Sequence, residues 1–89
     1  MVELIERSGK QTTINGKPVD LGILVNNGTD MIYVSGEPYD EQYVIRQRAI
    51  RRAFELATEY GCKYVLMGQQ ARWIDTNWLF IVSFYNDKK

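Results

Sequence analysis

The chain alternates between short apolar runs and turn sequences, except for one long stretch in its middle. Before residue 35 and after residue 63, the apolar runs are rich in β-branched and aromatic residues, which favour strands. Asn15-Gly16 is a strong hairpin signal, because both residue types tolerate the positive φ angles of a type I′ turn. We expect hairpins at three turn sequences: residues 15–16, 26–30 and 75–77.

The middle of the chain has the pattern of one amphipathic helix. Pro38 or Asp40 can open it, and no helix breaker follows before Gly61, which we expect to end it in a left-handed conformation. With the helical period of 3.6 residues, one side of this helix is apolar and the other is charged. The apolar side gathers Tyr43, Ala49, Ile50, Ala53, Phe54, Leu56, Ala57 and Tyr60.

These elements predict a single α+β domain over residues 1–89, in the order hairpin, helix, hairpin. We expect a four- or five-stranded, mostly antiparallel sheet with one long amphipathic helix packed on one face. Eighty-nine residues leave no room for a second core. Cys62 is the lone cysteine and has no disulfide partner within the chain, so we expect it to be a small buried hydrophobe.

The strands carry apolar residues on both sides, although one helix covers only one face of a sheet. The last run has two alternating sets that are both largely apolar: Trp78, Phe80, Val82 and Phe84, and Leu79, Ile81, Ser83 and Tyr85. The second face is therefore either sealed by strand twist and loops, or open as a docking face for another protein or a second copy. We favour the docking face, with these candidate contact residues: Tyr33, Tyr64, Trp73, Trp78, Phe80 and Tyr85.

Four arginines of the helix form a candidate anion-binding site: Arg46, Arg48, Arg51 and Arg52. Such a cluster could hold a phosphate backbone or an acidic protein surface. The alternative, which the nearby acidic residues favour, is a solvated helix face on which Arg51 or Arg52 pairs with Glu55. Arg46 lies within the apolar arc, and we expect its stem to pack while its charged head reaches water, rather than an internal pair with a carboxylate.

Charge and residue types narrow the function classes. Eleven basic and eleven acidic side chains give a formal net charge of zero, which argues against charge-driven binding to nucleic acid or anionic membrane. The chain has no histidine, no Cys/His ligand set, no glycine-rich phosphate loop and no EF-hand spacing. We therefore expect no enzyme, no cofactor and no metal site. The absence of a signal-peptide pattern and of a long apolar run predicts a cytoplasmic protein without a membrane segment.

Together these features predict a small, non-catalytic protein–protein interaction module of the regulator, inhibitor or adaptor type, comparable to phage-type accessory proteins. It would bind a protein partner or a second copy of itself through the sheet face that the helix leaves uncovered. The alternative is a nucleic-acid-binding module, in which the helix arginines hold phosphates and sheet aromatics stack on bases. Salt distinguishes the two, because binding to phosphates weakens steeply as the salt concentration rises.

Overall fold

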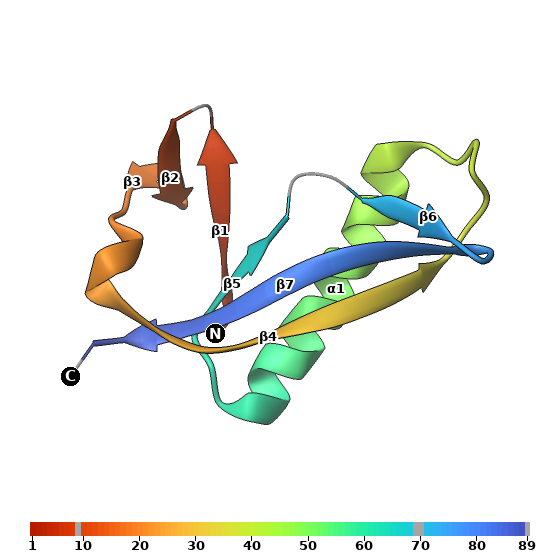
Figure 1. Ribbon diagram of the computed structural model, residues 1–89. Coiled ribbons are helices and arrows are strands. Elements are labelled where there is room, and N and C mark those ends of the chain that lie inside the picture. The colour runs from red at the N-terminus through yellow and green to blue at the C-terminus, as the bar shows by residue number, and fades with distance from the viewer. Residues whose placement is uncertain (9, 69–70, 89) are drawn as a thin grey trace.

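The computed structural model, which describes residues 1–8, 10–68 and 71–88, places one α-helix against a large mixed sheet (Figure 1). The helix α1 spans Gln42–Tyr60, and a short 3-10 helix, η1, spans Leu21–Ile23. The strands are β1 (Glu3–Ser8), β2 (Gln11–Ile14), β3 (Lys17–Pro18), β4 (Leu24–Ser35), β5 (Tyr64–Met67), β6 (Arg72–Ile74) and β7 (Asn77–Asp87). The order across the sheet is β3-β2-β1-β5-β7-β4, and β6 also pairs with β7.

The α+β prediction with one helix is confirmed, but the observed sheet has more strands than expected and is less uniformly antiparallel. Over the described residues, the observed sheet has seven strands rather than the expected four or five, partly because the expected run 64–74 is divided into β5 and β6. The sheet is also mixed, since β1 and β5 are parallel. These two strands are far apart in the sequence, whereas β4 and β5, which α1 connects, both pair antiparallel with β7 between them.

The hairpin expected at residues 26–30 is wrong, because these residues lie within β4. This single strand pairs with β7 along its whole length. An irregularity in the pairing between Asn26 and Gly28 accommodates the turn-forming residues. Gly28 has a φ of 139° there, and its N–H donates to Asn26 Oδ1 at 2.8 Å. Pairing with a long partner strand therefore outweighs the local preference for a turn.

The other expected chain reversals are present. Asn15 and Gly16 connect β2 to β3 with φ angles of 52° and 78°, as a type I′ turn requires. Asp75 and Thr76 connect β6 to β7 with φ angles of 47° and 70°. Gly61 ends α1 in the left-handed conformation, with its N–H bonded to helix carbonyls. The turn at Asn15-Gly16 and the helix end at Gly61 depend on residue types that accept a positive φ, which the sequence shows directly.

The core lies between α1 and one face of the sheet. The expected alternation in β7 is confirmed, since the set Trp78, Phe80, Val82 and Phe84 is buried against α1. Three small residues of α1 are fully buried: Ala49, Ala53 and Ala57. Ile45, which was not among the residues predicted for the apolar side of the helix, is fully buried with them. Tyr43 and Tyr60 are exposed rather than buried as expected, because Tyr43 lies at the margin of the apolar arc and Tyr60 is the last residue of α1.

A short link between β3 and β4 forces the sheet to curl. These strands form opposite edges of the sheet, and residues 19–23 are all that separates them. A link of this length reaches at most roughly 20 Å when fully extended. Five strand spacings across a flat sheet amount to about 24 Å. The β1–β3 end must therefore bend round, and in Figure 1 β1 and β2 run at a steep angle to β4 and β7.

Candidate protein-binding surface

The uncovered face, meaning the side of the sheet away from α1, is closed at one end. Ile5 pairs with Leu66, and Leu66 pairs with Ser83, so all three lie on this face. Ile5 is nevertheless fully buried. The curl of the β1–β3 end accounts for this burial. Next to this closed end, Thr29 Oγ1 and Ser83 Oγ lie 3.0 Å apart and form a polar boundary.

Beyond that boundary the uncovered face is apolar and open to water. We define the exposed apolar patch as Met31 and Tyr33 of β4, Leu79 and Ile81 of β7, and Ile74 of β6. Met31, Tyr33 and Ile81 are 62%, 59% and 51% exposed, whereas Leu79 is 9% exposed and forms the floor. The pairing register sets Met31 opposite Ile81 and Tyr33 opposite Leu79. The register of β4, β7 and β6 therefore brings these side chains together on one face of the sheet.

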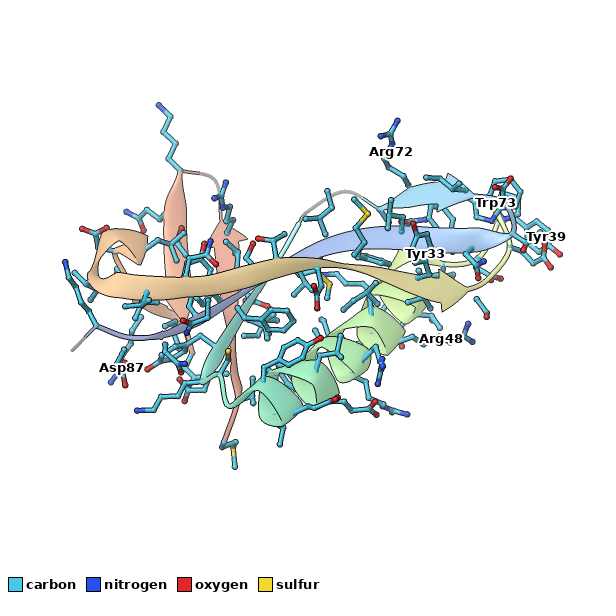
Figure 2. The ribbon with its side chains drawn as sticks, turned by 60° about the horizontal axis from the view of Figure 1, so that its bottom comes forward. Tyr33, Tyr39, Arg48, Arg72, Trp73 and Asp87 are labelled. Carbon is cyan, nitrogen blue, oxygen red and sulfur yellow. The ribbon has the colours of Figure 1, made fainter. Side chains whose placement is uncertain are left out.

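Arg72 borders the exposed apolar patch. It pairs with Leu79 across β6 and β7, on the side of Leu79 opposite to Tyr33. Arg72 is exposed, and Figure 2 shows its side chain extending away from the sheet. Figure 2 also shows Tyr33, Arg72 and Trp73 gathered at the end of the sheet remote from Asp87. The patch therefore has a positive charge at one margin.

The six predicted contact residues do not share one surface. Trp78 and Phe80 face α1 and are 7% and 2% exposed. The indole Nε1–H of Trp78 donates to the Glu37 carbonyl oxygen at 3.0 Å and so fixes the segment before α1. Trp73 pairs with Trp78 and therefore also lies on the side of the sheet that faces α1, although it is 41% exposed.

The three predicted tyrosines lie on the uncovered face but are divided between its ends. Tyr64 pairs with Tyr85 at the closed end, where both are half-buried. The Tyr64 hydroxyl donates to Asp87 Oδ1 at 3.2 Å. Partial burial, and after it this hydrogen bond, raises the pKa of Tyr64. Tyr33 alone belongs to the exposed apolar patch. The aliphatic members were missed because the prediction selected aromatic side chains rather than one alternating set.

The predicted arginine cluster is divided among separate contacts. Arg46 Nη1 donates to the Gly68 carbonyl oxygen at 3.1 Å, so this half-buried side chain holds the end of β5. Arg48 Nη1 donates to the Ser35 carbonyl oxygen at 3.1 Å. Arg52 forms an ion pair with Glu55 at 3.1 Å, as the solvated-face interpretation expects. Two of the four guanidinium groups therefore fasten α1 to its surroundings, and a third pairs within the helix.

A groove of about 400 Å³ runs between β4 and α1. It is lined by Asp30, Met31, Ile32, Tyr33, Arg52, Leu56 and Tyr60. The Tyr60 hydroxyl donates to Asp30 Oδ2 at 3.0 Å and connects the end of α1 to the strand. This hydrogen bond and the negative charge of Asp30 raise the pKa of Tyr60, because ionisation would place two negative groups in contact.

Asp30→Asn is expected to bring the pKa of Tyr60 down toward its ordinary value of 10.0. In the wild type, the hydrogen bond between Tyr60 and Asp30 therefore stabilises the fold at pH values below the ordinary pKa of tyrosine. This stabilisation is lost as the pH rises through the raised pKa of Tyr60. Ring-carbon NMR titration of each tyrosine measures the shift. Tyr64 is the internal control, because its partner is Asp87. An unchanged Tyr60 pKa would show that Asp30 does not accept a hydrogen bond from the Tyr60 hydroxyl.

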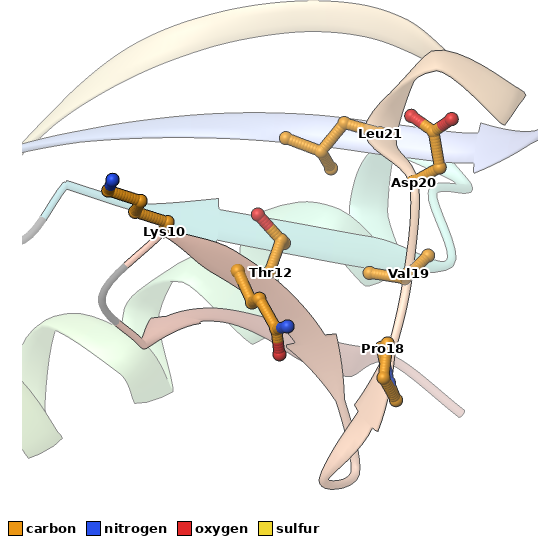
Figure 3. Close-up of a pocket in the computed structure, with 7 residues that line it drawn as sticks. Lys10, Thr12, Pro18, Val19, Asp20 and Leu21 are labelled. Atoms are coloured by element: carbon orange, nitrogen blue, oxygen red, sulfur yellow. The ribbon is translucent and has the colours of Figure 1, made fainter.

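A larger groove, of about 570 Å³, lies at the β2–β3 edge (Figure 3). It is lined by Lys10, Gln11, Thr12, Pro18, Val19, Asp20 and Leu21. Its one acid, Asp20, accepts the Gly22 N–H at 2.8 Å and thereby caps η1. Asp20 therefore stabilises the link between β3 and β4.

Two further findings concern only the part of the chain that the structure describes. Among these residues, no three Cys, Asp or Glu side chains come together in a way that could hold a metal ion. Within the same ranges, no helix combines the length and the apolar character needed to cross a membrane. Comparison with known protein families, characterised proteins and solved structures gave no match. The function is therefore argued from the surface itself.

Proposed function

We propose that the protein is a small protein-binding module whose binding surface is the exposed apolar patch. The observation that carries the proposal is the group Met31, Tyr33 and Ile81, each more than half exposed around the buried Leu79. Burying an apolar side chain of this size fully is worth about 1.5–3 kcal/mol relative to leaving it in water. Contiguous apolar groups held on rigid strands are the anchors that protein partners cover.

The chemistry of the surface indicates what the partner presents. An apolar side chain of the partner fits over Leu79, between Tyr33 and Ile81. A carboxylate beside it would pair with Arg72, which is exposed at the margin of the patch. With a formal net charge of zero, the chain exerts little long-range attraction of its own, so shape and apolar contact decide the match. A regulator, inhibitor or adaptor would act through such a contact.

The nucleic-acid alternative has less support. Arg46, Arg48 and Arg52 already bond to protein groups. The patch itself is mainly aliphatic, with Tyr33 as its one ring, whereas single-strand readers stack successive bases on several rings. Binding to a single-stranded oligonucleotide that weakens steeply with salt would nevertheless support the alternative.

Site-specific photocrosslinking tests the proposal in cells that make the protein naturally. A benzoylphenylalanine replaces Ile81 in the patch or, as control, Glu59, which is exposed on α1. We expect position 81 to give an adduct with a different protein that position 59 does not give. Adding Arg72→Glu, which reverses the charge at the margin, should remove this adduct. Equal adducts from both positions, or none from position 81, would overturn the proposal.

A further inference from the structure

We propose that two copies of the chain pair through the free edge of β4, so that one continuous sheet crosses the interface. This inference goes beyond the protein-binding patch, because it uses backbone groups at the edge of the sheet rather than side chains on its face. Every second residue of an edge strand directs its N–H and C=O away from the sheet, and another strand can pair with them.

The edges of the described sheet are protected in different ways, and one half of β4 is the exception. β3 has two residues, one of which is Pro18, and β6 has three. The first half of β4 is interrupted by the irregularity between Asn26 and Gly28. Its second half, residues 30–35, pairs with β7 without interruption and contains no proline, glycine or lysine. Its one charged residue is Asp30, at its start, whose carboxylate already accepts the Tyr60 hydroxyl. Natural edges that stay unpaired usually carry one of these features.

Two contacts from α1 hold the ends of this unprotected segment, and free space lies beside it. Tyr60 bonds to the Asp30 side chain at one end of the segment, and Arg48 bonds to the Ser35 carbonyl oxygen at the other. The groove of about 400 Å³ lies along the segment, between β4 and α1. The helix therefore fixes both ends without filling the space that an added strand would need.

A second copy of the chain is the strand that fits, because the segment is complementary to itself. In an antiparallel register centred on Ile32, Met31 of one copy lies opposite Tyr33 of the other. Asp30 then lies opposite Val34, so no like charges face each other. Met31 and Tyr33 are the most exposed large apolar residues of the described strands, at 62% and 59%, and the pairing packs each beside the other across the interface. The net charge of zero adds no overall repulsion between copies.

The symmetry of this pairing fixes the shape of the dimer. Antiparallel neighbours related by a two-fold axis have that axis perpendicular to the sheet, so both copies of α1 lie on the same side. The two exposed apolar patches become adjacent on the opposite side. Ile81 and Arg72 stand away from the β4 edge, in β7 and β6, and remain available to the partner proposed above.

Two double variants that differ in one residue test both the edge and the register. Met31→Lys/Tyr33→Lys sets lysine opposite lysine across the interface, whereas Met31→Lys/Tyr33→Glu sets lysine opposite glutamate. Sedimentation velocity over a wide concentration range measures the mass, and circular dichroism confirms that both variants fold. We expect the wild type and the Lys/Glu variant to reach twice the chain mass of 10.4 kDa. For the Lys/Lys variant we expect the dissociation constant to rise at least about tenfold.

Each contrary result overturns the dimer. A wild type that stays at 10.4 kDa excludes self-pairing, and an extended peptide of another protein would then be the strand that binds β4. Equal dissociation of both variants would place self-association on another surface. The proposed function fails separately, because it is judged by adducts between position 81 and a different protein. Both double variants lose the same two apolar side chains, so that crosslink responds to them alike.

Discussion

Phe80→Ala is expected to lower the free energy of unfolding by about 3–5 kcal/mol, whereas Ile81→Ala changes it by about 0.5 kcal/mol. The two residues are neighbours on β7 but point to opposite faces of the sheet. Phe80 is 2% exposed and packs in the core beneath α1, whereas Ile81 is 51% exposed in the patch. For a chain of this length the total stability is about 4–13 kcal/mol, so the loss of Phe80 removes a large share.

Urea unfolding followed by tryptophan fluorescence measures both variants. The two variants compare a core position with a surface position on the same strand, and each removes a large apolar side chain. Similar losses for both variants would mean that the uncovered face is packed as well as the α1 face, and the exposed apolar patch would not exist. Phe80→Ala is expected to affect partner binding only through the loss of folded protein.

Ile5→Ala is expected to cost about 2–5 kcal/mol, although Ile5 lies on the face that α1 does not cover. This side chain is fully buried, which the curl of the β1–β3 end explains. Ile23→Ala, in η1 itself, is the matched control. Ile23 is 57% exposed, and its loss should change stability by about 0.5 kcal/mol.

Thermal or urea unfolding of the two isoleucine variants checks the closed end of the uncovered face. If Ile5→Ala is as mild as Ile23→Ala, the sheet is flatter than described and its uncovered face is open along its whole length. The exposed apolar patch would then extend past the boundary formed by Thr29 and Ser83.

Local preferences allowed much of the fold to be predicted. The turn at Asn15-Gly16 and the stop at Gly61 depend on residues that accept positive φ angles, and both are present. The alternation in β7 was also correct, because side chains in a strand point to opposite faces with a period of two. Such features need only a few neighbouring residues to be right.

Long-range pairing decided the features that the sequence did not predict. Residues 26–30 read as a turn, yet β7 supplies a partner along the whole of β4. The parallel pairing of β1 with β5 joins strands that β2, β3, β4 and α1 separate in the sequence, so no local pattern encodes it. The curl that buries Ile5 depends on where β3 and β4 lie in the sheet order. In each case the partner strand is distant in sequence.

The candidate surface was found in outline but not residue by residue. An excess of apolar strand residues over what one helix can cover correctly indicated an exposed apolar area. Because both alternating sets of β7 are apolar, the sequence could not show which set α1 covers. Trp78 and Phe80 were selected for their rings, and they belong to the covered set. Ile81 and Met31, which lie on the uncovered face, have no rings and were passed over.

Carbene footprinting of the uncovered face tests the central claim most directly, because the label reacts with aliphatic and aromatic side chains alike. The protein is labelled once in purified form and once in an extract of the cells that make it. We expect Ile81 and Ile74 to react in the purified protein and to be protected in the extract. Tyr39 and Tyr43, which are 81% and 68% exposed away from the patch, should react equally in both. Unchanged labelling of Ile81 and Ile74 in the extract would contradict the account.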